Sequence, residues 1–258
     1  MPTHLALLAL GALALASCGD DGPPDAAPQP SITAQSTGTT QVSGEQPARI
    51  HPPIDRDTAV ASAIDIRAAG CGPRVRFGSG TAITEDLILT AAHVVSGADD
   101  VEVIDSTGIT SGATVVLFDP DDDVAVLRSA SPVGKPTQLR AEPAREEEVG
   151  IVVLTRLAAD TVETEIIDVR VLRPVNILTT DIYLDKDVER EGFEVTAPIE
   201  PGDSGAMVHL PGGGVGIIWA RSTDHEDRAW AVNIPDVLLD LDARSALQTQ
   251  VEDGRCAG

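Results

Sequence analysis

The chain has 258 residues, of which 42% are hydrophobic but only 2% are aromatic, so it can bury a sizeable core that is mostly aliphatic. Its 41 acidic and 18 basic residues give a formal net charge of −23. Because such a charge repels phosphate backbones, the composition argues against nucleic-acid binding as the main activity. At roughly 100 to 200 residues per domain, the length excludes a large multidomain assembly.

The first 17 residues predict an export signal. Residues 5–16 form an unbroken run of Leu, Ala and Gly, which has the length of a signal-peptide core and is too short to span a membrane. The run ends at Ser17 and Cys18 in the sequence LASC, which resembles a bacterial lipobox. This resemblance implies that Cys18 is lipidated and anchors the mature protein to a membrane. A plain cleaved signal followed by an unrelated cysteine is the alternative.

Residues 18–54 are predicted to form a disordered tether. They contain seven prolines, many Ser, Thr and Gln residues and almost no large apolar side chains, so they cannot offset the entropy of folding. Lipidation of Cys18 leaves Cys71 and Cys256 as one pair of cysteines in an oxidising, exported setting. A disulfide between Cys71 and Cys256 is then expected, and two unpaired thiols are the alternative.

From residue 55 onward the pattern predicts an all-β fold in two halves. Apolar residues occur in short clusters bounded by Gly, Pro and Asp, and β-branched residues are prominent. A segment rich in Pro and charge at 136–149 is expected to link a first lobe at 55–135 to a second at 150–258. The predicted strands are 74–77, 80–84, 87–90, 101–105, 113–118 and 124–128, then 150–155, 162–172, 177–184, 192–197, 206–210, 215–219 and 229–233.

The last part of the second lobe differs from the rest. An early Pro235 and apolar residues spaced three or four apart predict an amphipathic helix at about 235–248.

The hexapeptide EPGDSG at 200–205 is the most informative motif. Its Ser204 stands in a turn beside glycines, which let the backbone bend tightly and let a substrate approach closely. Successive main-chain N–H groups in such a turn can converge on a developing oxyanion. An ordinary hairpin turn is the alternative, because this composition forms turns in any protein.

Two further motifs each contain one residue with catalytic chemistry. His93 follows the apolar run LILTAA at 87–92, and its alternative is a buried histidine of the core. Asp123 is the last acid of the run DPDDD at 119–123 and abuts an apolar strand, so it could be buried, where a carboxylate needs a partner such as an imidazole N–H. A solvated turn is the alternative for this run.

The order His93, Asp123, Ser204 resembles that of the chymotrypsin-like (trypsin-like) serine proteases, and in particular a short bacterial, HtrA-like branch without a PDZ domain. The resemblance implies two six-stranded antiparallel β-barrels, a catalytic cleft between them and a C-terminal helix. It also implies that Ser204 is the nucleophile, His93 the general base and Asp123 the residue that orients the imidazole. The N–H groups of Gly202 and Ser204 would form the oxyanion hole, and no cofactor or metal is implied.

The resemblance also indicates supporting and substrate-binding residues. Asp203 precedes the nucleophile and needs a cation, for which Arg156 is the first candidate and Arg221 the second. The strand Ile218-Trp219-Ala220 is expected to pair with the substrate backbone by β-addition, and Pro198 to line the specificity pocket. The pocket should then accept small apolar residues, and the alternative is a preference for acidic residues selected by Arg221.

These inferences predict an exported serine endopeptidase that is anchored by lipid in the cell envelope, in the periplasm or at the cell surface. Its expected partners are protein or peptide substrates, with a membrane contact only through the lipid and no nucleic acid. The alternative is a lipoprotein that retains the protease fold as a binding or signalling module without turnover.

Overall fold

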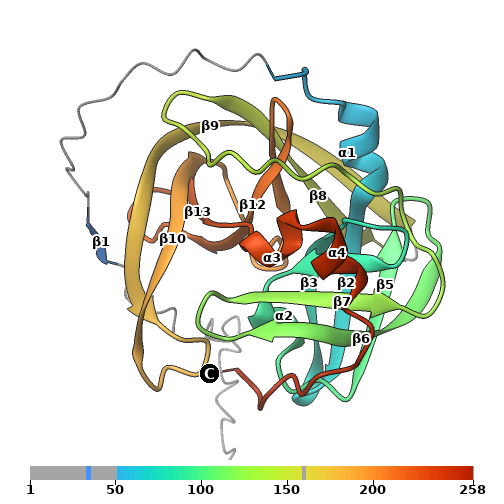
Figure 1. Ribbon diagram of the computed structural model, residues 1–258. Coiled ribbons are helices and arrows are strands. Elements are labelled where there is room, and N and C mark those ends of the chain that lie inside the picture. The colour runs from blue at the N-terminus through green and yellow to red at the C-terminus, as the bar shows by residue number, and fades with distance from the viewer. Residues whose placement is uncertain (1–32, 36–50, 159–160, 258) are drawn as a thin grey trace, which may run out of the picture.

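The computed structural model describes residues 33–35, 51–158 and 161–257, which fold into two β-sheet units with a few short helices (Figure 1). The predicted export signal at 1–17 and the expected lipidation site Cys18 lie outside the described residues. Within the described ranges, no helix is long and apolar enough to cross a membrane.

One strand lies in the segment expected to be a disordered tether. Residues Thr33–Gln35 form β1, which pairs antiparallel with residues 176–178, so these residues form a strand rather than a coil. The rest of the tether up to residue 50 lies outside the described residues.

The first unit is a closed six-stranded barrel with the strand order β2-β3-β4-β7-β6-β5, in which every pair of neighbours is antiparallel. Its aliphatic interior confirms the expectation of a core with few aromatic residues. The strands are β2 (Ala63–Gly70), β3 (Gly72–Ala82), β4 (Leu87–Thr90), β5 (Asp100–Asp105), β6 (Thr110–Asp119) and β7 (Val124–Ser129).

The strand boundaries in this barrel differ from the prediction in two places. Strand β2 was not predicted, although Ile64 and Ile66 alternate with Asp65 and are fully buried. The strands predicted at 74–77 and 80–84 are one continuous strand, β3, which runs through Gly78 and Ser79 and ends at Ala82. A Cβ at Gly80 would lie 2.8 Å from Ile66, so this glycine permits close packing across the barrel rather than a turn.

The second unit closes in a similar way. Its strands follow the order β9-β10-β13-β12-β11-β8, and the additional pairing of β8 with β9 joins the two ends of this sheet. The two units together confirm the all-β, chymotrypsin-like fold class. The strands are β8 (Val149–Ala158), β9 (Thr161–Thr180), β10 (Asp187–Thr196), β11 (Met207–Leu210), β12 (Gly213–Arg221) and β13 (Arg228–Asn233).

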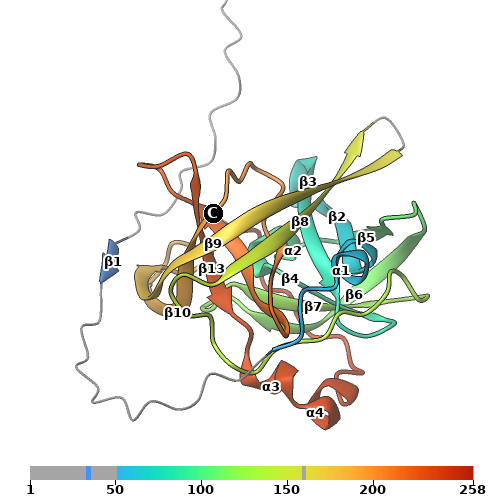
Figure 2. The same cartoon turned by 90° about the horizontal axis from the view of Figure 1, so that it is seen from above.

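Strand β9 is much longer than predicted. It runs for 20 residues without a break, whereas the sequence predicted separate strands at 162–172 and 177–184 with Pro174 between them. The proline is tolerated because pairing with β8 ends at Arg170, so one side of the strand needs no N–H donor at Pro174. Beyond this point β9 pairs with β10, and Figure 2 shows β8 and β9 projecting together from the body of the molecule.

Two short helices belong to the part of the chain that forms the first barrel, one before β2 and one between β4 and β5. The first, α1 (Arg56–Ser62), was not predicted; it is capped by Asp55, whose side chain accepts from the N–H of Thr58, and packs Ala59 against Ile151 of the second unit. The second, α2 (Ala92–Val95), directly follows β4.

The C-terminal helix predicted at about 235–248 is split into α3 (Asp236–Leu239) and α4 (Leu241–Ser245). Asp240 has an extended backbone between them, and its side chain accepts a hydrogen bond from the N–H of Ala243 at 2.9 Å, which caps α4. The sequence pattern missed this internal cap.

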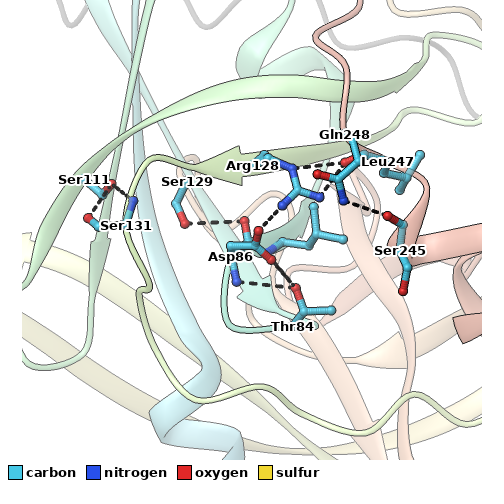
Figure 3. A network of polar contacts seen from close by, with 10 residues as sticks. Thr84, Asp86, Ser111, Arg128, Ser129, Ser131, Ser245, Leu247 and Gln248 are labelled. Atoms are coloured by element: carbon cyan, nitrogen blue, oxygen red, sulfur yellow. Dashed lines mark hydrogen bonds and ion pairs between the residues drawn. The ribbon is translucent and has the colours of Figure 1, made fainter. Parts of the chain in front are cut away.

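The segment after α4 is attached to the first barrel at several points. Arg128 of β7 donates to the carbonyl of Leu247 and also binds Asp86, as Figure 3 shows. Farther on, Cys256 forms a disulfide with Cys71, which confirms the expected pair. The chain after the second unit therefore returns to the barrel that carries His93.

Candidate active site

His93 lies on α2 with its ring only partly covered. The residues around it, Ala91, Ala92, Val94 and Val95, are buried, whereas the His93 side chain is 33% exposed. The small neighbours fix the short helix against the barrel without covering the imidazole. This geometry differs from that of a core histidine, which was the alternative for this motif.

Asp123 ends the turn between β6 and β7 and points at His93. Its Oδ2 lies 2.7 Å from His93 Nδ1, and its Oδ1 accepts from the backbone N–H of His93 at 2.9 Å. Asp123 has a φ of 57°, in the left-handed region that Asp tolerates better than most residues, and is 2% exposed. Both carboxylate oxygens are therefore partnered, as a buried carboxylate requires.

The turn that carries Asp123 is held by its own side chains. Asp119 Oδ1 accepts from the N–H groups of Asp121 and Asp122, both at 3.0 Å. The carbonyl of Asp123 accepts from the N–H of Ala92 at 3.2 Å, so the turn and α2 are joined through main chain as well as through the carboxylate. The acidic run is thus a structured turn, and Asp119 is a residue whose role in it the sequence analysis did not identify.

Ser204 lies in a tight turn that is docked on the first barrel. The N–H of Asp203 bonds to the carbonyl of Glu200 at 3.1 Å, with Pro201 and a positive φ of 103° at Gly202 in between, which is the pattern of a type II turn. The N–H of Ser79 donates to the carbonyl of Ser204 at 2.7 Å. This bond connects the Ser204 turn directly to β3.

Gly205 marks the closest contact between the Ser204 turn and the strands that lead to His93. A Cβ at this position would lie 2.0 Å from the carbonyl oxygen of Ser79, 2.5 Å from Thr90 Oγ1 and 3.1 Å from the N–H of Ala91. Ala91 is two residues before His93, so the serine and histidine motifs pack against each other. The described residues show no hydrogen bond between the Ser204 hydroxyl and the His93 ring.

The N–H groups predicted to form the oxyanion hole are those of Gly202 and Ser204. Within the described part of the chain, neither group donates a hydrogen bond to the protein, whereas the neighbouring N–H groups of Asp203, Gly205 and Ala206 all do. Two unpaired donors therefore flank the bonded N–H of Asp203. Such donors are available to an oxygen of a bound substrate.

Asp203 is fully buried, and the cation beside it is Arg156. Arg156 Nη2 lies 3.1 Å from Oδ1 and 3.0 Å from Oδ2 of Asp203, and the N–H of Glu200 donates to Oδ2 at 2.8 Å. Burial raises the pKa of Asp203, and the bonds from Glu200 and Arg156 oppose this increase. Arg221, the second candidate for the cation, is exposed and forms no ion pair with Asp203.

The predicted substrate-binding residues lie before and after the Ser204 turn in the sequence. Ile218 bonds through its backbone to Gly205 and to Ala206, and pairing between β11 and β12 stops at Ile217. Ala220 and Arg221 of β12 therefore pair with β13 on one side only, and Trp219 lies at an irregularity in that pairing. Trp219 is buried and Ala220 partly buried beside this free edge, and Pro198 is exposed in the segment after β10.

In the described ranges, no group of three or more His, Cys, Asp or Glu side chains is arranged to hold a metal ion.

Comparison with known proteins supports the same type of site. The family model described as "Trypsin-like peptidase domain" matches residues 78–215, which include His93, Asp123 and Ser204. Two curated proteins of Mycobacterium tuberculosis, serine protease Rv3671c and serine protease MT3772, are each 30% identical over 224 residues. The match covers 85% of this chain but 55% of each relative, so the chain spans about half the length of these relatives.

Solved structures agree with the sequence matches. The active form of the Rv3671c protease from M. tuberculosis has a TM-score of 0.67 at 25% identity, over 84% of this chain and 100% of that chain. The HtrA-type protease AlgW with a tripeptide has a TM-score of 0.59 at 20% identity, over 74% of this chain and 62% of that chain, and this likeness concerns the fold alone.

Proposed function

Because this chain belongs to the trypsin-like peptidase domain family, we propose that it is a serine endopeptidase in which Ser204, His93 and Asp123 act together. The observation that carries the proposal is the contact between His93 Nδ1 and the buried Oδ2 of Asp123 at 2.7 Å. This contact leaves the other ring nitrogen, Nε2, directed away from Asp123 and available to a hydroxyl. The docking of the Ser204 turn on β3 and the close approach of Gly205 to Thr90 and Ala91 support this arrangement.

The reaction would proceed by acyl transfer. Ser204 Oγ attacks the carbonyl carbon of a peptide bond while His93 Nε2 accepts its proton, and His93 then donates this proton to the leaving amine. Asp123 accepts from Nδ1–H, which fixes the tautomer and stabilises the protonated ring. Water attacks the acyl-enzyme in the second half of the reaction, with His93 again as the base.

The two unpaired N–H groups of Gly202 and Ser204 would bind the oxygen of the tetrahedral intermediate. The loss of one donor of this kind typically lowers the rate by about 10² to 10³. Arg156 would support this hole indirectly, because it holds the side chain of Asp203, the residue between the two donor residues in sequence.

Substrate would bind as an added strand along residues 219–221. The free edge of β12 offers main-chain groups to an extended peptide, which favours a protein or peptide substrate over a small molecule. We further propose a preference for small apolar side chains at the cleaved residue, because Ala220 carries a methyl group at the edge and Pro198 adds no charge. A preference for acidic residues would instead identify Arg221 as the selecting group.

The proposed location is the cell envelope, with the protein exported and anchored through lipid on Cys18. The apolar run at 5–16 and the lipobox-like sequence before Cys18 support it. Mass spectrometry of the N-terminal peptide from bacterial membranes tests this proposal. A diacylglyceryl cysteine at position 18 is expected, whereas an unmodified Cys18 would leave only a cleaved signal.

Covalent labelling tests the proposed activity. A fluorophosphonate should modify the wild-type protein at one site, fail to modify Ser204→Ala, and modify Ser222→Ala normally, because Ser222 is a serine of an exposed loop segment. Replacement of Ser204 or His93 should reduce turnover on the order of 10⁶-fold. Folded wild-type protein that is neither labelled nor active would favour the binding-module alternative.

A further inference from the structure

Arg190 is a buried cation that the proposed mechanism has not yet used. It lies on β10 with only 2% of its surface exposed, although charged side chains are almost never fully buried without partners. Burial lowers the pKa of Arg190, and nearby carboxylates, Asp123 first among them, oppose this decrease. The guanidinium remains the protonated form that arginine keeps in proteins.

Arg190 contacts two parts of the candidate active site at once. Its Nε donates to the backbone carbonyl of Asp121 at 2.5 Å, within the turn that ends at Asp123. Its guanidinium carbon lies 4.7 Å from the centre of the Trp219 ring on β12, at the strand expected to bind substrate. A single side chain thereby joins β10, the Asp123 turn and the substrate strand.

Several buried polar atoms on Arg190 and its neighbours have no hydrogen-bond partner. Arg190 Nη2, Trp219 Nε1 and Asp121 Oδ1 are buried polar atoms without a hydrogen-bond partner. All three belong to residues that touch one another or are joined by the Nε bond. Because an unpaired buried donor costs free energy, this arrangement is less stable than one in which the guanidinium is fully paired. The side chain lies between the Trp219 ring and the turn that ends at Asp123.

The charged groups near the turn and Arg190 come from three elements. The turn before β7 supplies four carboxylates, the turn after β9 supplies one carboxylate and a lysine that pairs with the first turn, and β10 itself supplies one more carboxylate. They are Asp119, Asp121, Asp122 and Asp123, then Asp181 and Lys186, then Glu191. Of the two cations in this group, Arg190 is buried and Lys186 is exposed.

We propose that Arg190 is a positioning residue that fixes the Asp123 turn, and with it the His93–Asp123 pair, against the substrate strand. This inference rests on the proposed function, because it assigns Arg190 a role in that same site. The Nε bond to Asp121 holds the turn, and the contact of the cation with the Trp219 ring holds the strand.

The test of this role uses three variants. Arg190→Met removes the charge and the Nε bond, and Arg190→Lys keeps the charge but cannot form the same fork of donors. Arg173→Met is the matched control, because Arg173 on β9 also lies over a tryptophan, 6.0 Å from the centre of the Trp230 ring, and pairs with Glu194 at 2.8 Å. No contact joins Arg173 to the Asp123 turn in the described part of the chain.

The Nδ1–H proton of His93, which faces Asp123, is observed by NMR in the full chain carrying Ser204→Ala, which needs no enzymatic activity, with the signal assigned by its loss in His93→Asn. This signal should shift or broaden in both Arg190 variants, because the Asp123 turn loses the Nε bond, while Arg173→Met should match the parent. Folded Arg190 variants whose Nδ1–H signal equals that of the parent would overturn the positioning role.

The effect of Arg190 on positioning is also measured by kcat, in protein that retains Ser204. Both Arg190 variants should lose kcat on the order of 10-fold to 10²-fold, while Arg173→Met keeps it. An unchanged kcat in Arg190→Lys would overturn the positioning role. This result is decisive even if Arg190→Met does not fold. If the parent chain itself has no turnover, the proposed function fails, and the Nδ1–H signal of His93 still decides whether Arg190 positions the Asp123 turn.

Discussion

Arg156 and Asp203 form an ion pair between the outer part of the β8–β9 hairpin, close to its turn, and the Ser204 turn, with both carboxylate oxygens within 3.1 Å of one guanidinium nitrogen. The Asp203 side chain has no exposure to solvent, whereas Arg156 is 44% exposed. Because Asp203 directly precedes Ser204, the position of the carboxylate fixes the position of the proposed nucleophile and of the two unpaired N–H groups beside it.

The first prediction concerns this pair. Arg156→Met should lower the rate of fluorophosphonate labelling at Ser204 by about 10²-fold, because it leaves Asp203 buried without its cation and distorts the oxyanion hole. The measurement is the second-order labelling rate of folded protein.

Arg170→Met serves as the control for Arg156→Met. Arg170 is also on the second unit, and its ion pair with Glu147 is exposed on both sides, so its loss should change stability by less than about 0.5 kcal/mol and leave labelling unchanged. Equal labelling rates for Arg156→Met and wild type would show that the pair does not support the site.

The second prediction compares two glycines of the Ser204 turn. Gly202 and Gly205 both have positive φ, at 103° and 92°, so alanine is strained at either position. A Cβ at Gly202 meets no atom within 4 Å, but at Gly205 it meets the carbonyl of Ser79 at 2.0 Å. Gly202→Ala should therefore cost about 1 to 2 kcal/mol of unfolding free energy, and Gly205→Ala more than about 3 kcal/mol.

Urea unfolding of both variants measures this difference, with labelling at Ser204 as a second readout. If Gly205→Ala proves as stable as Gly202→Ala, the close packing of the Ser204 turn on β3 is not required in solution.

The sequence was most informative where a function depends on a few consecutive residues. The motifs around His93, Asp123 and Ser204 are local, so their residue types and order could be read without knowing how the strands pair. The disulfide could also be predicted without the fold, because Cys71 and Cys256 are the two cysteines that remain in an exported protein once Cys18 is set aside for lipidation. The resemblance to a family then supplied the two-barrel architecture that no single motif encodes.

Features that depend on distant packing were missed. A gap was predicted at residues 78–79, but β3 continues through them, with Gly80 allowing Ile66 to approach across the barrel. A gap was also predicted around Pro174, but this proline lies where β9 pairs with β10 only. Arg190 lies in a segment rich in charged residues and gave no signal, because its burial results from Trp219 and the Asp123 turn, which are far away in sequence.

The third prediction concerns the disulfide, which joins residues 185 positions apart. Cys71→Ser combined with Cys256→Ser should lower the unfolding free energy by about 2 to 4 kcal/mol, because the crosslink restricts the unfolded chain across a long loop. The native contacts that remain nearby, such as the N–H of Gly97 to the carbonyl of Asp253 at 3.0 Å, should keep the folded structure similar.

Urea unfolding of oxidised wild type, reduced wild type and the double variant provides the test. The reduced wild type and the double variant should coincide. A double variant as stable as the oxidised protein would mean that the crosslink does not limit the unfolded state.

The last prediction concerns His209 on β11, a histidine that sequence analysis left without a role. It is 3% exposed, and burial lowers its pKa from the ordinary value of 6.5 to about 4. The folded protein therefore keeps His209 neutral at pH values where the unfolded chain has already bound a proton. Since stability rises with pH wherever the unfolded state binds more protons, the contribution of His209 is complete above about pH 6.5 and is lost progressively as the pH falls toward 4.

At 1.36 kcal/mol for each pH unit between these two values, the loss amounts to about 3 kcal/mol near pH 4. His209→Leu should remove this part of the pH dependence, so that its stability falls less than that of wild type between pH 7 and 4. His225→Leu is the control, because His225 lies in an exposed loop and its loss should leave the profile parallel to that of wild type. Parallel profiles for wild type and His209→Leu would contradict the prediction, because they would mean that His209 binds its proton equally well in the folded and unfolded protein.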